Sequence, residues 1–422
     1  MNRLVYSSLW VVGIPFALMR LAWRARKQPD YLRNVSERFG AIARSKRPTL
    51  WIHAVSVGET RAAQPLIKAL RGRFPDHDIL LTHMTPTGRA TGAELYGKDE
   101  HIRQCYLPYD LPWLVRRFLQ RARPAVGIVM ETEVWPNLLR AARNAGIPTL
   151  LVNARLSERS ARGYSRLGQL SRQAFGDFTH IGAQAEADAT RLRDCGATAV
   201  SVTGNMKFDV ETPADVATRG DRFRAWANGR PVLLAASTRE GEEDLLLADF
   251  ARMATNDVLL VLVPRHPQRF DEVASMVERH GLSVSRRSQQ GEGAIDTRVW
   301  LGDSMGEMAA YYRMADVCLM GGSWLPYGSQ NLIEPCAAGV PVVLGPSTFN
   351  FADAAAKALA AGAAMQCDNV DAGVEAGLAL LENAPRRAQM GEAGARFAAE
   401  HRGATARTLA LIESALAGAP GG

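Results

Sequence analysis

Residues 321–346 read GGSWLPYGSQNLIEPCAAGVPVVLGP, and they are the most informative part of the sequence for the fold. An apolar strand ends at Gly321, a loop rich in glycine, serine and asparagine follows, and a helix is expected to begin near Gln330–Asn331. Free backbone N–H groups and the positive end of a helix dipole suit an anion such as a phosphate. We expect Glu334 about one turn into the helix, where a carboxylate accepts hydrogen bonds from ribose hydroxyls.

Short apolar strands alternate with amphipathic helices on both sides of this stretch. In the C-terminal half the expected strands are PVLLAAST (231–238), DVLLVLVPR (257–265), LSVSRRS (282–288), TRVWLGDS (297–304), DVCLMGGS (316–323) and VPVVLGP (340–346). In the N-terminal half they are TLWIHAVSVGE (49–59), DILLTHM (78–84), AVGIVMETE (125–133) and PTLLVNAR (148–155). Strands separated by helices predict parallel, doubly wound sheets of the α/β class.

The chain is long enough for two domains, because its 422 residues exceed the roughly 250–300 at which single cores stop growing. The strand–helix alternation breaks at the polar stretch 210–230 and then restarts. We therefore predict two Rossmann-like lobes that face a cleft, with ligands beyond the carboxyl ends of the strands. The predicted parts are a membrane anchor with its basic flank (1–30), an N-terminal lobe (31–210), a linker (211–222), and a C-terminal lobe with the tail (223–422).

Three further motifs follow strands of the C-terminal half. WLGDSMGEM (300–308) has glycines that allow close approach of the backbone, and Glu307 is either a donor contact or a partner of the helix dipole. VPRHPQRF (263–270) places Arg265 at a strand end, where a guanidinium binds phosphate or carboxylate. In ASTREGEED (236–244) only Arg239 is singled out, because acids in a first helical turn are ordinary capping.

The informative string of the N-terminal half is HAVSVGET (53–60). Glu59 is expected at the start of a helix, whose dipole would keep the carboxylate ionised near neutral pH, as a general base must be. The same position is also typical of simple helix capping. Glu131 follows another strand, Lys207 precedes the interdomain linker, and residues 153–164 concentrate arginines that suit an anionic acceptor.

An apolar run opens the chain at residues 4–19 and is followed by cations. Residues 1–50 carry ten basic and two acidic side chains, a larger excess than the net charge of +7 of the whole chain. We expect an uncleaved anchor that spans the membrane or lies in its interface, with the rest of the chain in the cytoplasm. An ordinary amphipathic or buried helix is the alternative.

Five scattered cysteines form no CxxC pair, which favours a reducing compartment over a disulfide framework or a zinc site. The basic pI of 9.3 also suggests a nucleic-acid-binding protein tethered to a membrane. Such a protein would interleave base-stacking aromatic residues with its cations. Residues 1–50 instead pair the cations with an apolar run, so we predict no nucleic-acid partner and an anionic lipid surface instead.

Taken together, the strings resemble the 3-deoxy-D-manno-octulosonic acid (Kdo) transferases, which are inverting glycosyltransferases of the GT-B fold. The resemblance covers nearly the whole chain, through the apolar N-terminus, HAVSVGE, METEVWPN, NARLS, GNMKFD, VPRHP, GDSMGE and GSQNLIEP. It implies CMP-Kdo as donor substrate, a lipid A precursor as anionic acceptor, and neither a metal ion nor a cofactor. It also implies work in lipopolysaccharide synthesis at the cytoplasmic face of the inner membrane.

The resemblance also implies roles for single residues. Glu59 matches the proton acceptor, and Glu131 and Lys207 match positions that stabilise the transition state. The positions that match contacts to CMP are Pro264, Arg265, Met305, Gly306, Glu307, Asn331, Leu332, Ile333 and Glu334. The chain departs from the family at Ser329 and Gln330, where Gly-His is usual before the asparagine.

Two other enzymes remain open from the residues alone. One is a membrane-associated GT-B transferase that uses a different nucleotide sugar, such as a UDP-sugar, because no base-stacking motif identifies the nucleotide. The other is a phosphate-binding epimerase of the same fold, which would lack an anchor.

Overall fold

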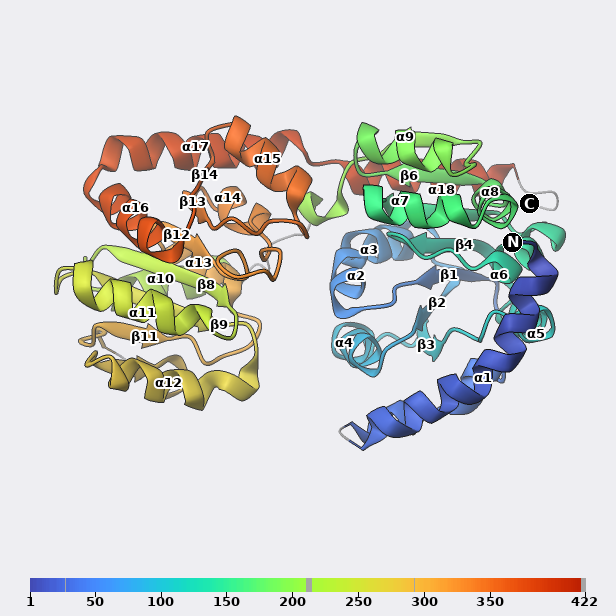
Figure 1. Ribbon diagram of the computed structural model, residues 1–422, viewed down its shortest axis with the longest axis horizontal. Coiled ribbons are helices and arrows are strands. Elements are labelled where there is room, and N and C mark those ends of the chain that lie inside the picture. The colour runs from blue at the N-terminus through green and yellow to red at the C-terminus, as the bar shows by residue number, and fades with distance from the viewer. Residues whose placement is uncertain (27, 210–214, 292, 419–422) are drawn as a thin grey trace. The chain divides into compact units, whose positions relative to one another are not determined.

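The computed structural model describes residues 1–26, 28–209, 215–291 and 293–418. The chain divides into two compact units. The N-terminal unit comprises Met1–Val210 together with Arg402–Gly422, and the C-terminal unit comprises Glu211–His401. Each unit is built around one parallel sheet of seven strands (Figure 1).

The sheet of the N-terminal unit has the strand order β3-β2-β1-β4-β5-β6-β7. Its strands are β1 (Thr49–His53), β2 (Asp78–His83), β3 (Ile102–Tyr106), β4 (Pro124–Met130), β5 (Thr149–Ala154), β6 (His180–Ala183) and β7 (Val200–Val202). All five residues of β1 are buried, as expected for a parallel strand covered on both faces. Side chains alternate between the faces, so Leu50 and Ile52 pack in one core and Trp51 in another.

Helices cover both faces of this sheet. They are α2 (Val57–Ala62), α3 (Gln64–Arg73), α4 (Pro86–Tyr96), α5 (Pro112–Ala122), α6 (Pro136–Asn144), α7 (Glu158–Arg166), α8 (Gln169–Gly176), α9 (Glu186–Asp194) and α18 (Ala404–Ala417). Short 3₁₀ helices are η1 (Pro29–Leu32), η2 (Val35–Phe39) and η3 (Met206–Asp209). The cores on the two faces are separate, with α3 and α18 on one side and α5 and α6 on the other.

The C-terminal tail corrects the predicted boundary, because residues 402–422 belong to the N-terminal unit and not to a lobe over 223–422. Helix α18 contacts α3, β4 and β6, and Ala404 and Ile412 are fully buried in the N-terminal core (Figure 1). The Asp209 carboxylate accepts the N–H groups of Gly403 at 2.7 Å and Thr405 at 2.6 Å. An amphipathic sequence predicts a buried face but does not show which core will cover it.

The sheet of the C-terminal unit has the order β10-β11-β9-β8-β12-β13-β14. Its strands are β8 (Val232–Thr238), β9 (Leu259–Pro264), β10 (Val284–Arg286), β11 (Val299–Leu301), β12 (Val317–Met320), β13 (Val342–Leu344) and β14 (Ala364–Gln366). Its helices are α10 (Asp215–Trp226), α11 (Glu242–Met253), η4 (Pro267–Arg269), α12 (Phe270–Arg279), η5 (Arg287–Gln289), α13 (Met308–Met314), α14 (Ile333–Ala337), α15 (Ala352–Ala360), α16 (Val370–Glu382) and α17 (Ala384–Glu400).

The linker predicted at 211–222 is also corrected. Residues 211–214 lie outside the described residues, and residues 215–222 form most of α10, which packs on α13 of the C-terminal unit. Val216, Gly220 and Phe223 are buried, and the Phe223 ring lies 5.0 Å from that of Trp300. The polar residues between these three conceal their helical spacing in the sequence.

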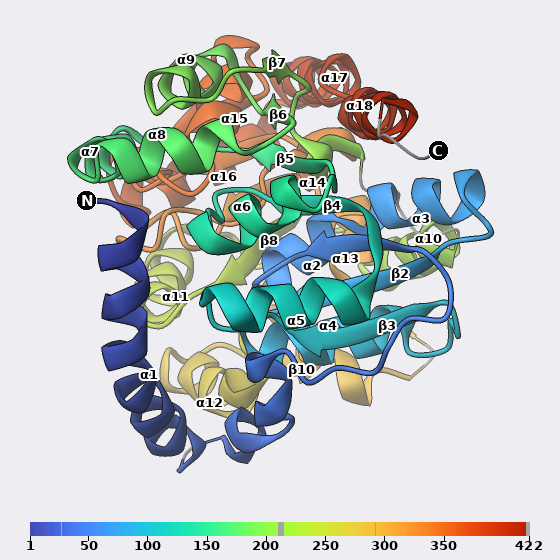
Figure 2. The same ribbon diagram turned by 90° about the vertical axis from the view of Figure 1, so that its right-hand side faces the viewer.

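The apolar N-terminus forms helix α1 (Arg3–Ala25), as predicted. Helix α1 runs along the N-terminal unit (Figure 2). One side packs on this unit, where the Trp10 ring lies 5.7 Å from the Tyr109 ring and 6.4 Å from the Trp135 ring. Other side chains of α1 are exposed and apolar: Leu4, Val5, Leu9, Val11, Val12, Phe16, Met19 and Trp23. By length and composition α1 is able to cross a membrane.

Candidate active site

The carboxyl ends of β1 and β4 meet where the strand order of the N-terminal sheet reverses. The chain passes from β1 to β2 and β3 on one side, and then crosses to β4 and continues to β7 on the other. In open parallel sheets, ligands bind beyond the strand ends at this reversal. Glu59 lies in the first turn of α2 after β1, and Glu131 follows β4 directly. The fold therefore brings together two carboxylates that the sequence had singled out.

Glu59 belongs to a capping box at the start of α2. Its carboxylate accepts the N–H of Val55 at 2.8 Å and the hydroxyl of Ser56 at 2.9 Å, and the Ser56 hydroxyl accepts the N–H of Glu59 at 3.4 Å. Burial, followed by the negative charge of Glu131, raises the pKa of Glu59 to about 7. The pKa therefore lies above the value expected from the helix start alone, and the carboxyl group is partly ionised at neutral pH. With this pKa the carboxyl group exchanges its proton near neutral pH, which suits a general base.

Glu131 and Lys207 form an ion pair, with 3.5 Å between Lys207 Nζ and Glu131 Oε1. Glu131 has a φ of 57°, in the left-handed region that non-glycine residues seldom adopt. Such backbone strain is concentrated at functional sites. Three predicted residues from distant parts of the sequence, Glu59, Glu131 and Lys207, thus lie at one edge of the sheet.

The strand order of the C-terminal sheet reverses between β8 and β12. Here the loop after β12 approaches the end of β8 so closely that a Cβ on Gly321 would lie 2.5 Å from the carbonyl oxygen of Ser237. Gly322 has a φ of 70°. The predicted glycine loop is confirmed, and glycine is required there both for space and for conformation.

The helix after this loop begins later than predicted, since α14 starts at Ile333 instead of near Gln330–Asn331. The N–H of Ser329 donates to the Gly322 carbonyl, and the N–H of Gln330 donates to the Gly321 carbonyl. The Asn331 side-chain oxygen accepts the N–H of Ile333 at 3.1 Å. Asparagine side chains compete with helical hydrogen bonds in this way. Glu334 is consequently the second residue of α14, in its first turn.

Asn331 and Glu334 are partly exposed and joined by a hydrogen bond of 2.8 Å from Asn331 Nδ2 to Glu334 Oε1. The side chains of Leu332 and Ile333 are 0% and 2% exposed, so they fill the core and leave only backbone atoms for a ligand. Pro264 is likewise buried at the end of β9. The predicted contacts of these three residues are therefore limited to the backbone.

Cationic side chains gather at the ends of β8 and β9. The N–H of Arg265 donates to the Thr238 carbonyl at 2.9 Å, which fixes Arg265 beside the end of β8. Arg239 lies 4.4 Å from the centre of the Tyr327 ring. Burial, followed by the charges of Arg239, Arg265 and Arg269, lowers the pKa of His266. This concentration of positive charge suits an anion.

The loop after β11 exposes Met305 and Gly306 but not the side chain of Glu307. The Glu307 carboxylate accepts hydrogen bonds from Arg219 at 3.2 Å and Arg287 at 2.9 Å. The predicted donor contact of Glu307 therefore competes with two ion pairs in this structure. Gly306, at a φ of 77°, leaves the backbone of the turn accessible.

Glu242 is a residue that sequence reasoning missed. Its fully buried carboxylate accepts backbone N–H groups of Arg239 at 2.8 Å, Gly322 at 2.7 Å and Trp324 at 3.0 Å, with Leu325 at 3.3 Å. It therefore ties the glycine loop to the start of α11. An acid in a first helical turn gives no signal in the sequence that distinguishes this role from ordinary capping.

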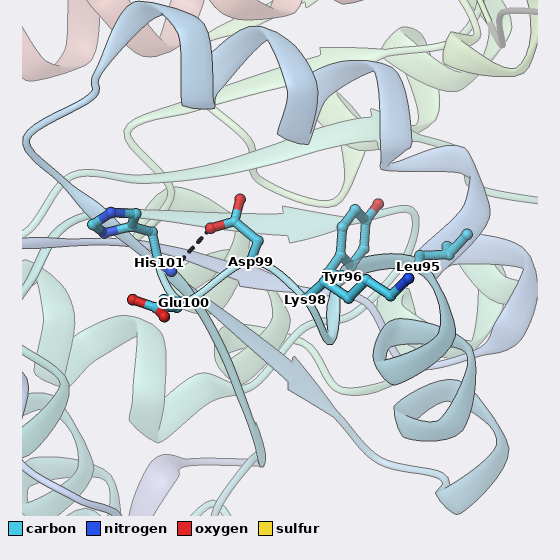
Figure 3. A pocket seen from close by; sticks show the side chains of 6 residues that line it. All are labelled: Leu95, Tyr96, Lys98, Asp99, Glu100 and His101. Atoms are coloured by element: carbon cyan, nitrogen blue, oxygen red, sulfur yellow. Dashed lines mark hydrogen bonds between the residues drawn. The ribbon is translucent and has the colours of Figure 1, made fainter.

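A shallow pocket of about 590 Å³ lies elsewhere, beside the amino end of β3 (Figure 3). Its lining carries both charge signs, and the His101 ring contacts Asp78 at 3.1 Å. The pocket is lined by Leu95, Tyr96, Lys98, Asp99, Glu100 and His101. None of these residues lies at the carboxyl edge that holds Glu59 and Glu131.

Solved structures with this fold define the class of protein. A glycosyltransferase from Rickettsia africae ESF-5 matches with a TM-score of 0.59 and 13% identity, over 88% of this chain and 99% of that one. A UDP-GlcNAc 2-epimerase from Neisseria meningitidis matches with a TM-score of 0.59 and 15% identity, over 87% of this chain and 100% of that one. The fold is therefore GT-B, which transferases and epimerases share. The family of group 1 glycosyl transferases matches residues 282–397 and favours the transferase.

Sequence relatives identify the family. The family described as 3-deoxy-D-manno-octulosonic-acid transferase matches residues 33–210. The 3-deoxy-D-manno-octulosonic acid transferase of Bordetella pertussis is 48% identical over 390 residues, which cover 89% of this chain and 90% of that one. That of Haemophilus influenzae is 34% identical over 98% of both chains. The chain belongs to the Kdo transferase family, and it is a glycosyltransferase.

Proposed function

We propose that the chain transfers Kdo from CMP-Kdo to the sugar headgroup of a lipid A precursor during lipopolysaccharide synthesis, in one inverting displacement. The observation that carries the proposal is a carboxyl group with a pKa of about 7, Glu59, beside the Glu131–Lys207 pair at the strand reversal. The cationic, glycine-rich edge of the C-terminal unit supports a donor that is both a phosphate ester and a carboxylate.

In the proposed reaction the acceptor hydroxyl gives its proton to Glu59, and the acceptor oxygen attacks the anomeric carbon of Kdo. The bond from that carbon to the phosphate oxygen of CMP breaks, and CMP leaves with the bonding electron pair. Attack opposite to the leaving group inverts the configuration. Glu131 and Lys207 stabilise the charge that develops at the reacting sugar.

Donor binding is assigned to the C-terminal unit. Arg265 and Arg239 meet the negative charges of CMP-Kdo, while Asn331 and Glu334 bind polar groups of the nucleotide. The proposal includes neither a metal ion nor a further cofactor, because Arg265, Arg239 and the accessible backbone of the turn at Gly306 meet the negative charge.

We also propose that α1 attaches the enzyme to the cytoplasmic face of the inner membrane by lying in the interface. The supporting observation is its packing, since Trp10, Ile14 and Ala17 contact the N-terminal unit while an apolar side remains exposed. Arg20 and Arg24 follow in the same helix and suit anionic headgroups. One side of α1 packs on the protein, so only the opposite, apolar side is left to enter the membrane. Interfacial amphipathic helices bury one apolar side in the same way.

Mass spectrometry of the product tests the reaction, with purified full-length chain, a lipid A precursor and CMP-Kdo generated in place. We expect the precursor to gain the mass of Kdo, and CMP to raise the melting temperature more than UMP does. A precursor that remains unmodified while a UDP-sugar is consumed would show a transferase with a different donor. Stabilisation by UMP equal to that by CMP would contradict the assigned nucleotide.

A further inference from the structure

Strand β5 ends in a bulge at Asn153, next to the site of Glu59 and Glu131. The pairing of β5 with β6 shifts register between Leu151 and Ala154, and Asn153 within the shift has a φ of 52°. Asparagine is one of few residues other than glycine that adopt this conformation readily. Bulges beside active sites redirect a side chain, and the Asn153 side chain is completely buried.

The redirected amide holds the turn that carries Lys207. Asn153 Oδ1 accepts the N–H of Met206 at 3.0 Å, and the Asn153 carbonyl accepts Gln184 Nε2 at 2.9 Å. Asn205 Oδ1 accepts the N–H of Lys207 at 3.0 Å. Two side-chain amides therefore fix the backbone at Met206 and Lys207, the start of η3, while the Met206 side chain is fully buried in the core.

Lys207 needs such an anchor because a flexible lysine side chain loses rotamer entropy when it is held in place. The ion pair to Glu131 is partly exposed, and pairs of this kind contribute little by themselves. A fixed backbone at Lys207 leaves its side chain fewer positions to sample, so holding the ammonium group on Glu131 costs less conformational entropy. The position of η3 therefore decides whether Lys207 stays on Glu131.

We infer that Asn153 is a positioning residue, which holds η3 so that Lys207 neutralises Glu131 and thereby sets the charge that Glu59 meets. The inference rests on the proposed role of Glu59 as general base. The charge of the partly buried Glu133 also raises the pKa of Glu59, and burial raises the pKa of Glu133 itself. On α4, Arg89 pairs with Glu37 and Glu94 with Arg61, and burial lowers the pKa of His53 to about 3 and of His83 to about 4.

The test is the pH dependence of kcat for Asn153→Gly in the full-length enzyme. Glycine keeps the left-handed backbone and removes the acceptor for Met206, so the main chain of the bulge is not strained. Without Lys207 beside it, the negative charge of Glu131 disfavours ionisation of Glu59, so the acidic limb of the profile moves to higher pH. We expect kcat to fall roughly tenfold, while KM for CMP-Kdo changes less than about twofold.

Two controls separate positioning from stability. Asn228→Gly removes an exposed asparagine of the C-terminal unit with a φ of 49°, and it should leave the limb in place. Lys207→Met should reproduce the shift of the limb, and Asn153→Gly should add no further shift in the Lys207→Met background. Such non-additivity is expected when one residue acts through the other.

The inference is overturned if Lys207→Met moves the limb but Asn153→Gly does not, or if the two shifts add. A lower melting temperature of Asn153→Gly with an unchanged limb would likewise reduce Asn153 to a purely structural role. Failure of the underlying proposal looks different: Glu59→Gln would then retain turnover, whatever Asn153→Gly does. Each outcome is measured as the pH midpoint of the acidic limb of the kcat profile. Only folded enzyme turns over, so partial unfolding lowers the amplitude of the profile but does not move this midpoint.

Discussion

The two units place different chemistry on the same edge of similar sheets. At the carboxyl edge of the N-terminal sheet, partly buried acids dominate, and the charge of Glu131 adds to burial in raising the pKa of Glu59. At the carboxyl edge of the C-terminal sheet, arginines surround His266, and a glycine loop lies against the end of β8. Seven parallel strands support both arrangements, so the loops and not the sheets decide the chemistry.

The two edges suit two different tasks of a transferase, proton removal and donor binding. Proton removal needs a group that is neither always charged nor always neutral, and burial beside a second acid produces that condition. Binding of a charged donor needs permanent cations and fixed N–H groups. Substitutions on the two edges should therefore affect different measurements, and the following predictions test that separation.

The largest effect is expected at Glu59. Glu59→Gln removes the proton acceptor but keeps the shape of the side chain and its capping position, for which glutamine is also suited. Turnover should fall by roughly 10²–10⁴, while CMP binding stays unchanged. Product formation by mass spectrometry and calorimetric titration with CMP measure the two quantities.

Glu186→Gln is a matched control for Glu59→Gln, because Glu186 is an exposed acid in the first turn of α9 in the same unit. It should leave both turnover and CMP affinity unchanged. Near-normal turnover in a folded Glu59→Gln enzyme would show that another group takes the proton.

The second effect is expected at Arg265. Arg265→Met removes a charge-assisted contact worth about 1.5–3 kcal/mol, so CMP should bind roughly 10–100 times more weakly. The pH profile of kcat should not move, since Arg265 lies on the other unit from Glu59. Arg279→Met, at an exposed arginine in the last turn of α12, is the control. Weaker CMP binding in Glu59→Gln but not in Arg265→Met would reverse the assignment of the two units.

The sequence predicted most of the fold because its central strands are long and apolar. All ten expected strands are present, whereas the four that were missed, β3, β6, β7 and β14, are short and partly polar. These four include three of the four edge strands, β3 and β7 in one sheet and β14 in the other, where burial is one-sided. Apolar runs therefore predict the central strands, whereas β10 is the one edge strand that was predicted.

The candidate site was less predictable than the fold. Glu59, Glu131, Arg265 and the glycine loop follow strand ends and were found by that rule. Burial was not visible in the sequence, so the pKa of Glu59, the ion pairs of Glu307 and the role of Glu242 were missed. These properties depend on neighbours that are distant along the chain, and a local pattern contains no information about them.

The third effect concerns α1, which has no counterpart in the C-terminal unit. Phe16 is 64% exposed on the apolar side, and Phe16→Glu should lower binding to anionic vesicles roughly tenfold while the Trp10 contacts stay intact. Leu245→Glu, at a half-exposed leucine on α11, should have no effect. Vesicle sedimentation measures binding. Resistance of the wild-type protein to alkaline extraction would indicate a spanning helix and contradict the interfacial one.

The smallest effect is on the free energy of unfolding. It compares Glu59 of the N-terminal unit with Glu242 of the C-terminal unit. Burial raises the pKa of both Glu59 and Glu242. A carboxyl group with a raised folded-state pKa contributes stability that is complete below the unfolded-state value near 4.5 and is lost as the pH rises through the folded-state value, about 7 for Glu59. Glu59→Gln should therefore leave the free energy of unfolding almost unchanged at pH 4 and increase it at pH 8, where only the glutamate carries a charge in the partly buried site.

Glu242→Gln should act in the opposite direction, because the Glu242 carboxylate accepts backbone N–H groups from Gly322 and Trp324 among others. A glutamine would turn an NH₂ group toward one set of these donors and leave buried N–H groups without an acceptor, at a cost of about 1–3 kcal/mol. Chemical denaturation of both variants at pH 4 and pH 8 measures the difference. If Glu59→Gln destabilises the enzyme at pH 8 as much as Glu242→Gln does, Glu59 has a structural role. The acid–base chemistry could then no longer be assigned to the carboxyl edge of the N-terminal sheet.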